Sequence, residues 1–423
     1  MALKNNNFLF TKDLRKIFVN FGYLSLLQLI GIIGPIVIFP YLIDKLGKEN
    51  YGLIIFAQAT ATFFVVLVNF GFNITATQEI SQYRNNKNKI SEIVSSVLIL
   101  KCLLIIFSII LLTAIIPFIP EAKNNYLLFY VSLYLCLNDL VLPIWYFQGI
   151  EEMKYITYLN SFSKILTLIL ILVLIKTPED YIKVPIIYLV SGIIIGFIAM
   201  RIIFVNHKIK FVYLGIRKTL SYARSSFYIF LSRASFVLME SSSKIIINSF
   251  FGLSELAVYD FLLKITEALR KPFSLLSQAF FPYLSKTKNM KMSKRILMYS
   301  TLVSFFVYIA LVLASDRITL FFLDLSEIDN VFYGFLILGF SIPLSCLTWG
   351  LGENVLVVKG HLKEYNFSTI LQIGIYFLFA GVLYLMFGTL TFKMILLLYV
   401  IPIFFEVLLR LYFVKKFKIF GNT

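Results

Sequence analysis

The sequence carries little charge and lacks the long polar stretches of a soluble domain. Only 14% of its 423 residues are charged and 59% are hydrophobic, whereas a soluble domain has roughly a quarter charged residues. The few histidines and cysteines are also scattered: His207 and His361 lie in distant polar loops, and Cys102, Cys136 and Cys346 lie inside apolar runs. We therefore expect buried cysteines, no disulfide framework, no metal and no cofactor.

Apolar runs of membrane-spanning length follow one another from about Asn20 to about Val414. A hydrocarbon core of about 30 Å needs roughly 20 apolar residues per helix. The sequence therefore predicts an all-α integral membrane protein with about twelve transmembrane helices. The predicted spans are 19–43, 51–73, 92–118, 125–147, 157–176, 183–205, 222–251, 256–283, 297–315, 331–357, 367–388 and 393–414.

Basic residues are distributed unevenly between the two faces that these spans define. The net charge is +17, which the positive-inside rule explains better than nucleic-acid binding does. One face collects Lys4, Lys12, Arg15, Lys16, Arg84, Lys87, Lys89, Lys154, Arg201, Lys208, Lys210, Arg217, Lys218, Arg224, Lys286, Lys288, Lys291, Lys294, Arg295, Lys359, Lys363, Arg410, Lys415, Lys416 and Lys418. The other face has Lys45, Lys48, Lys123, Lys176, Lys183, Arg317 and Lys393. The bias predicts that both termini are cytoplasmic.

A weak internal repeat divides the chain into two halves. Residues 46–56 and 251–261 each contain a glycine turn, Gly47 or Gly252, then an acidic residue and a helix that opens with an aromatic residue. We predict an N-terminal six-helix bundle over 1–206, a cytoplasmic linker over 207–220 and a C-terminal six-helix bundle over 221–423. Transporters built from two such halves bind substrate at the interface of the repeats.

Four motifs in register resemble those of polysaccharide biosynthesis flippases of the Wzx type. They are YLIDKLGKENYG at 41–52, NFGF with TATQEIS over 69–81, WYFQGIEEMKY at 145–155 and FPYLSK at 281–286. The resemblance implies the multidrug/oligosaccharidyl-lipid/polysaccharide exporter fold, with two six-helix bundles around a central cavity. It also implies flipping of undecaprenyl-pyrophosphate-linked O-antigen units, for lipopolysaccharide biosynthesis, from the cytoplasmic to the periplasmic leaflet of the bacterial inner membrane. Expected partners are this lipid-linked oligosaccharide, a polysaccharide polymerase and a chain-length regulator.

Ionisable residues within spans are functional candidates because burying them in lipid is costly. The span 222–251 and the span 256–283 each carry several charges on one helical face. The candidate substrate-binding cations are Arg233, Lys244, Lys264, Arg270 and Lys271. The candidate ion-coupling carboxylates are Glu240, Asp260, Glu267 and Asp139. Glu240 with Lys244, and Asp260 with Lys264, are each four residues apart and could pair within their helix. The alternative to a cavity-lining role is that the charges form static pairs that join the two helices.

The N-terminal half carries mainly uncharged polar residues in its spans. These suit sugar hydroxyls, although ordinary interhelical hydrogen bonding would use them equally. The candidate sugar contacts are Gln58, Thr62, Asn69, Asn73, Asn160 and Lys164. Three further charges need no substrate: we expect Lys101 to snorkel toward the cytoplasmic surface, and Glu353 and Glu406 to lie at the membrane interface.

Other functions lack sequence support. A membrane-embedded polysaccharide polymerase would need a long periplasmic loop, an acyltransferase would need an intramembrane histidine, and a channel would need a selectivity filter. No nucleotide-binding motif is present, so we expect alternating access driven by an ion gradient and no enzymatic activity. A drug or ion exporter of the same superfamily and a lipid II flippase remain open alternatives.

The charge asymmetry generates a topology prediction. With an even number of spans and a basic face inside, a reporter enzyme that works only in the periplasm should be inactive when fused after Thr423. Activity comparable to that of a fusion in the predicted outer loop near Lys176 would contradict the even-span arrangement.

Overall fold

The computed structural model describes residues 2–323 and 327–420. Most side chains of residues 2–29 and 216–239, and those of Ile32, Ile33, Pro282 and Ile328, lie outside the described set. Throughout the described part all regular structure is helical, and nine segments are long and apolar enough to cross a membrane. The predicted class, an all-helical membrane protein, is confirmed.

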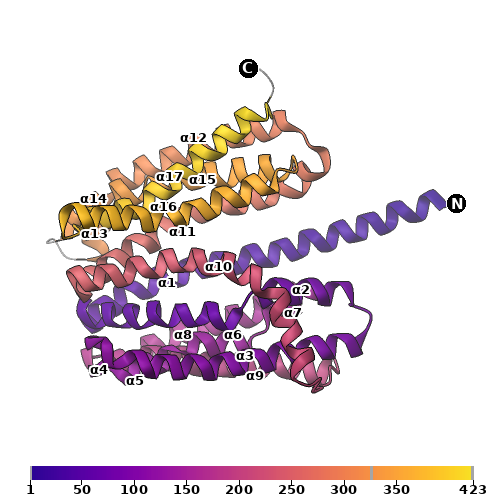
Figure 1. Cartoon of the computed structure of the whole chain (residues 1–423), viewed down its shortest axis with the longest axis horizontal. Coiled ribbons are helices and arrows are strands. Elements are labelled where there is room, and N and C mark those ends of the chain that lie inside the picture. Colours follow the sequence, from indigo (N-terminus) through magenta and orange to yellow (C-terminus); the bar gives the residue numbers. More distant parts are fainter. Residues whose placement is uncertain (1, 324–326, 421–423) are drawn as a thin grey trace. The chain divides into compact units, whose positions relative to one another are not determined.

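Helix packing divides the chain into two units (Figure 1). We call residues 1–46 and 57–237 the N-terminal unit, and residues 47–56 and 238–423 the C-terminal unit. Helix α10, Ile216–Phe251, contributes to both units. Residues 47–56 belong to the C-terminal unit although their neighbours along the chain on both sides belong to the other. The predicted six-helix domains on either side of 207–220 stay a prediction.

The two predicted glycine turns are present. Helix α1, Ala2–Asn69, covers two predicted spans and breaks at Gly47, where φ is 78°. Gly252, with φ 90°, precedes helix α11, Leu253–Thr287. Positive φ is accessible to glycine at little cost. Both turns belong to the C-terminal unit, and they bring Gly52 against α11: a Cβ on Gly52 would lie 1.9 Å from the carbonyl oxygen of Leu253.

The N-terminal unit continues with α2 (Phe72–Gln82), α3 (Lys87–Ile115), the broken span α5 (Tyr126–Ser132), α6 (Tyr134–Val141) and α7 (Ile144–Gly149), then α8 (Met153–Leu174) and α9 (Lys183–Arg201). Short segments η1 (Ile116–Phe118), α4 (Pro120–Asn124), η2 (Pro178–Ile182) and the π-helix η3 (Ile202–Asn206) connect them.

Small residues set the closest helix contacts in this unit. A Cβ on Gly192 of α9 would lie 1.8 Å from Asn138 Oδ1 of α6, and one on Gly196 would lie 2.4 Å from Val141. Lipid is as apolar as a leucine side chain, so close approach of this kind is what holds membrane helices together.

The C-terminal unit contains α11, α12 (Met290–Leu313), α13 (Ser315–Phe322), α14 (Ile328–Leu338), α15 (Ser341–Leu351), the π-helix η5 (Gly352–Val357), α16 (Leu362–Phe387) and α17 (Phe392–Lys416). Helix α15 packs against α11, α12 and α17 and forms the centre of this unit. The predicted span 331–357 is one membrane segment, interrupted at Gly339–Phe340.

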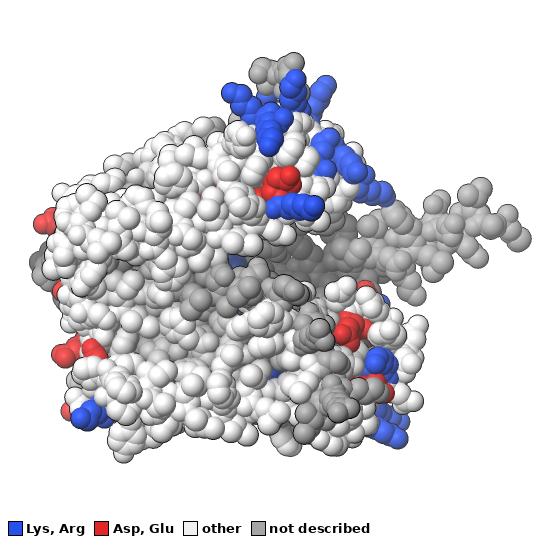
Figure 2. All heavy atoms as spheres, in the orientation of Figure 1, with Lys and Arg blue, Asp and Glu red and all other residues white. Residues whose placement is uncertain are grey.

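Contacts between loops agree with the predicted alternation of the spans. Arg84 forms an ion pair of 2.5 Å with Glu151, and both residues lie in loops predicted to be cytoplasmic. Lys48 pairs with Glu327 at 3.0 Å, and both lie in loops predicted to be outside. Lys and Arg side chains gather at one end of each unit (Figure 2). Which face is cytoplasmic stays a prediction.

One expectation about the cysteines is wrong. Cys136 and Cys346 are buried, but Cys102 is exposed. It lies on a face of α3 whose neighbours Leu103 and Ile106 are also exposed, and an apolar residue there costs little if that face contacts lipid.

The close approach at Gly52 generates a stability prediction. Gly52→Ala would place a methyl group against the Leu253 carbonyl, so one helix must shift, at a cost of about 1–3 kcal/mol. The midpoint of thermal aggregation in detergent should fall. Gly34→Ala in the same helix is the matched control, because a Cβ there meets nothing within 4 Å. Equal midpoints for both variants would contradict the prediction.

Candidate functional site

The charged cluster of the C-terminal unit is centred on the Asp260 carboxylate of α11. Asp260 is 3% exposed. Its Oδ2 accepts a hydrogen bond of 2.9 Å from the Tyr51 hydroxyl, and Oδ1 accepts one of 3.2 Å from Lys244 Nζ on α10. Lys264, one turn along α11, forms an ion pair with Asp260 and contacts the Tyr51 hydroxyl. One carboxylate therefore holds two lysines and one tyrosine from three segments of the chain.

A second charged group lies further along the same two helices. Lys244 also approaches Glu240 to 4.0 Å, and Arg270 lies 3.6 Å from Glu267. Arg270 donates a hydrogen bond of 2.9 Å to the Tyr399 hydroxyl of α17. The predicted pairing of Glu240 with Lys244 and of Asp260 with Lys264 is confirmed.

The two remaining predicted cations, Arg233 and Lys271, have no described contact with the two charged groups. Arg233 lies in α10, but its side chain lies outside the described residues. Lys271 is partly buried on α11, next to Arg270. The candidate cations on α10 and α11 therefore outnumber the carboxylates that lie among them. The cations are Arg233, Lys244, Lys264, Arg270 and Lys271, and the carboxylates are Glu240, Asp260 and Glu267.

The N-terminal unit buries a smaller charged group. Lys101 of α3 is 0% exposed and donates hydrogen bonds to Asp139 of α6, to Oδ2 at 2.6 Å and to the backbone oxygen at 2.9 Å. Asn69 donates to Asp139 Oδ1 at 3.1 Å. The prediction that Lys101 snorkels is wrong, because the Asp139 carboxylate compensates its charge within the unit.

The predicted sugar contacts do not form one group in the structure. Gln58 donates to the Tyr134 hydroxyl at 3.2 Å, and Thr62 donates to the Gln58 backbone oxygen at 2.8 Å. Asn69 belongs to the Asp139 group described above. The bonds of Gln58 and Asn69 are of the interhelical kind that was the alternative, whereas the bond of Thr62 lies within α1.

The other three candidates lie elsewhere in the same unit. Asn73 accepts from Thr77 through its backbone oxygen at 2.7 Å, and Asn160 donates to the Ile156 backbone oxygen at 2.9 Å. Lys164 Nζ lies 2.8 Å from the place a Cβ on Gly31 would take, so this glycine leaves room for the ammonium group.

Two further charges were placed wrongly from the sequence. Arg410, counted among the loop cations, is 3% exposed, and Glu406, expected at the interface, is 7% exposed. They form an ion pair of 2.6 Å within α17. Arg410 also donates to the hydroxyls of Ser368 and Thr369, each at 3.0 Å. Burial within the unit is tolerated because every side of the guanidinium has a partner.

Comparison with known proteins assigns the family. The family model described as polysaccharide biosynthesis protein matches residues 17–288. The chain belongs to this family. A "Putative O-antigen transporter" of Escherichia coli K12 is 29% identical over 268 residues, which are 63% of this chain and 65% of that protein. A second of the same name, from Shigella dysenteriae, is 24% identical over 63% of this chain and 67% of its own. The chain thus matches a little under two thirds of the length of the Escherichia coli relative.

Solved structures share the fold of this polysaccharide biosynthesis protein. An inward-facing multidrug resistance MATE family transporter of the MOP superfamily superposes with a TM-score of 0.68 at 13% identity, covering 91% of this chain and 97% of its own. The lipid II flippase MurJ, in an inward closed conformation, superposes with a TM-score of 0.72 at 15% identity, covering 92% and 87%. The predicted exporter fold is confirmed.

The motif at 145–155 that suggested the polysaccharide biosynthesis family has a packing role. Trp145 and Phe147 are 0% exposed. The Tyr146 hydroxyl lies 2.8 Å from His207 Nδ1. Burial lowers the pKa of His207, against an opposing effect of Glu152, so the imidazole is neutral at pH 7. The motif therefore anchors the end of the π-helix η3 to the core of the unit.

Sequence reasoning missed Tyr51 and Tyr399 as partners of the charged residues. Tyr51 lies in the motif 41–52, but only the glycine turn at Gly47 and the contact at Gly52 bring it to α11. Tyr399 lies in an otherwise apolar stretch of its span, about two turns from the nearest charged residues, Lys393 and Glu406. Each phenol hydroxyl forms hydrogen bonds beside an ion pair. No regular spacing along the sequence marks a tyrosine with this role.

The Asp260 cluster generates a stability prediction. Asp260→Asn leaves Lys244 and Lys264 without their shared carboxylate, and losing one partner of a buried pair costs about 3–5 kcal/mol. The thermal midpoint in detergent should fall, and adding Lys264→Met should restore part of it by removing one unpaired ammonium group. Asp44→Asn is the control, because the Asp44 side chain is 69% exposed in its pair with Lys45. A midpoint for Asp260→Asn equal to that of the control would exclude a structural role for the cluster.

Proposed function

We propose that the protein is a flippase for lipid-linked polysaccharide repeat units. It would move undecaprenyl-pyrophosphate-linked O-antigen, or a similar unit, from the cytoplasmic to the periplasmic leaflet by alternating access. Membership of the polysaccharide biosynthesis family supports this proposal. The Escherichia coli and Shigella relatives support it too, since both are named as O-antigen transporters. The function is transport, not enzymatic conversion.

The observation that carries the proposal is the concentration of charge on two membrane helices. Lys244 of α10 and Lys264 of α11 both pair with Asp260 of α11. Further along α11, Arg270 donates a hydrogen bond to Tyr399. Charged residues in membrane helices are rare and mark substrate or ion pathways. A pyrophosphate crossing hydrocarbon needs cationic partners, while the polyprenyl tail can remain in lipid.

The arrangement of the lysines suggests why substrate binding would be reversible. Asp260 already neutralises part of the charge of Lys244 and Lys264, so a pyrophosphate would compete with a carboxylate for them. Tyr51 and Tyr399 can retain a hydrogen bond to whichever group is present. A site with only free cations would hold a dianion too tightly to release it.

Arg233 is the residue that we propose contacts the pyrophosphate near the middle of the membrane. It lies about a dozen residues from the cytoplasmic end of the span, which at about 1.5 Å per residue is roughly half the bilayer. A guanidinium group can donate two parallel hydrogen bonds to phosphate oxygens. This role is inferred from sequence position and from the cations that accompany it on α10 and α11.

Coupling and partners complete the proposal. In the absence of a nucleotide-binding motif, an ion gradient would drive the cycle, with Glu240, Asp260, Glu267 or Asp139 as carriers. A polysaccharide polymerase and a chain-length regulator would receive the flipped unit. The protein would lie in the cytoplasmic membrane with both termini in the cytoplasm.

Deletion of the gene should abolish surface polysaccharide, which gel analysis of extracted polysaccharide would measure. In the deletion strain, Arg233→Ala should fail to restore it while accumulating normally in the membrane. Arg233→Lys should restore it in part, because it keeps the charge but loses the planar fork. Lys45→Ala removes an exposed cation and should restore it fully.

Two results would contradict these expectations. Full restoration by Arg233→Ala at native expression would remove Arg233 from the substrate path. Normal surface polysaccharide in the deletion strain, with a block in peptidoglycan synthesis instead, would favour the lipid II flippase alternative.

A further inference from the structure

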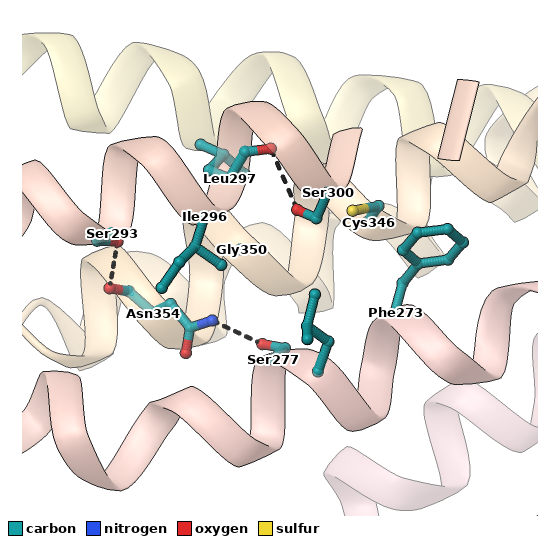
Figure 3. Close-up of a pocket in the computed structure, with 10 residues that line it drawn as sticks. Phe273, Ser277, Ser293, Ile296, Leu297, Ser300, Cys346, Gly350 and Asn354 are labelled. Carbon is teal, nitrogen blue, oxygen red and sulfur yellow. Dashed lines mark hydrogen bonds between the residues drawn. The ribbon is translucent and has the colours of Figure 1, made fainter. Parts of the chain in front are cut away.

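A small cavity with both apolar and polar side chains in its lining lies inside the C-terminal unit, apart from the Asp260 cluster. Its volume is about 10 Å³, close to the smallest space that holds one water molecule. The polar groups that line it include Ser277 of α11, Ser293 and Ser300 of α12, and Asn354 of η5 (Figure 3). A space of this size in a membrane-spanning bundle suits a single small polar occupant.

The amide of Asn354 is incompletely satisfied beside this cavity. Asn354 is 4% exposed. Its Nδ2 donates to Ser277 Oγ at 3.0 Å and its backbone oxygen accepts from Ser293 Oγ at 3.0 Å. Its Oδ1 is buried and accepts no hydrogen bond from the described residues. Buried amide oxygens normally have a partner, and a water molecule bound in the cavity would supply one.

Glu353 precedes Asn354 and reaches the same serine. Ser277 Oγ donates to Glu353 Oε2 at 3.1 Å. Among the described residues, no Lys, Arg or His lies within ion-pair distance of Glu353, whereas Glu406 has Arg410 at 2.6 Å. The π-helix η5 brings consecutive side chains to one hydroxyl, and such turns occur often at functional sites. An ionised Glu353 thus has the Ser277 hydroxyl as its direct hydrogen-bond partner, and the charge of Arg410 acts on it from beyond ion-pair distance.

The hydrogen-bond chain has two possible directions. With Glu353 ionised, Asn354 Nδ2 donates to Ser277 and Ser277 donates to Glu353. With Glu353 protonated, its O–H would donate to Ser277, whose hydroxyl would turn to donate to Asn354 Oδ1 after the amide rotates by half a turn. The cavity water can donate to Oδ1 in the first state and accept from Nδ2 in the second.

We propose that Glu353, Ser277 and Asn354 form a proton-binding site, with the cavity water completing it in both states. The proton comes from the aqueous phase and bonds to a Glu353 carboxylate oxygen, and no other bond is made or broken. Each of the three side chains has a hydrogen-bond partner in either state. Binding and release of the proton therefore require only that the Ser277 hydroxyl and the Asn354 amide rotate.

Among the titratable groups around the site, Glu353 is the one that we expect to bind the proton. From α17, Arg410 and Glu406 face this region, and they already pair with each other. Tyr365 of α16 stacks its ring under Arg410, whose guanidinium carbon lies 4.7 Å from the ring centroid. Cys346 of α15 lines the cavity, while α11 and α12 contribute serines. A thiol and a phenol are already protonated at neutral pH, so the carboxyl group is the one that can take up a proton on acidification.

The proton site would couple transport to the proton gradient, and this role rests on the proposed function. The site itself does not, since it concerns one carboxyl group and its neighbours. A carboxylate that changes charge inside a membrane bundle alters the cost of burying η5 between α11 and α17. Proton binding would therefore favour one packing of these helices over another.

Infrared difference spectroscopy of the purified protein during a pH titration tests the site without substrate. The wild type should gain the carbonyl band of a protonated carboxylic acid on acidification. Glu353→Gln should lose this band, and Glu406→Gln, which alters the ion-paired carboxylate, should retain it. Ser277→Ala should keep the band but shift its midpoint, because the hydroxyl partner of both states is gone.

The outcomes separate the two claims. A band that persists in Glu353→Gln, or a midpoint unmoved by Ser277→Ala, would overturn the proton site. If the band behaves as expected, translocation of a fluorescent lipid-linked oligosaccharide in proteoliposomes should depend on pH in the wild type and much less in Glu353→Gln. An unchanged pH profile would overturn the coupling role. No translocation by the wild type, with the band intact, would count against the proposed function alone.

Discussion

The C-terminal unit depends on the interactions that compensate the buried charge of the Asp260 carboxylate. This carboxylate is almost completely buried, and it lies in a helix that the sequence predicts to cross the membrane. A carboxylate in that position is tolerated only when its oxygens are occupied by donors, and here Tyr51, Lys244 and Lys264 supply them. Because Tyr51 comes from α1, this one group also fixes residues 47–56 in the unit to which the second half of the chain belongs.

The same constraint is met in three places by different means. Lys101 is buried with Asp139 and Asn69, Arg410 with Glu406 and two hydroxyls, and the lysines of α10 and α11 with Asp260. In each case the charge is neutralised locally by residues of another helix or of the next turn. Lipid provides no hydrophobic drive for helix association, so these groups and the glycine contacts supply specificity that apolar packing would not.

These satisfied charges also bear on transport. In the proposed function, the pyrophosphate would take the place of the Asp260 carboxylate beside Lys244 and Lys264, and Tyr51 would keep a hydrogen-bond partner. Glu353 is partly buried and differs from the buried acids Asp260 and Glu406 because a serine is its hydrogen-bond partner and no cation lies within ion-pair distance among the described residues. The unit thus contains both a compensated cluster suited to exchange with an anionic ligand and a carboxyl group suited to exchange with a proton.

The sequence determined the features that depend on composition and on short-range pattern. The all-helical membrane class follows from apolar length, and the turns at Gly47 and Gly252 follow from the repeat, because the bilayer and the glycine backbone act locally. The helical pairing of Asp260 with Lys264 also follows from a spacing of four. The tertiary structure decided which distant residues meet. Tyr51 reaches Asp260, Lys101 is buried instead of snorkelling, and Arg410 lies inside the unit, because partners from other helices lower the cost of burying each charge. The Asn354 oxygen left beside a cavity is likewise set by the packing of α11, α12, α15 and η5, which no spacing along one helix encodes.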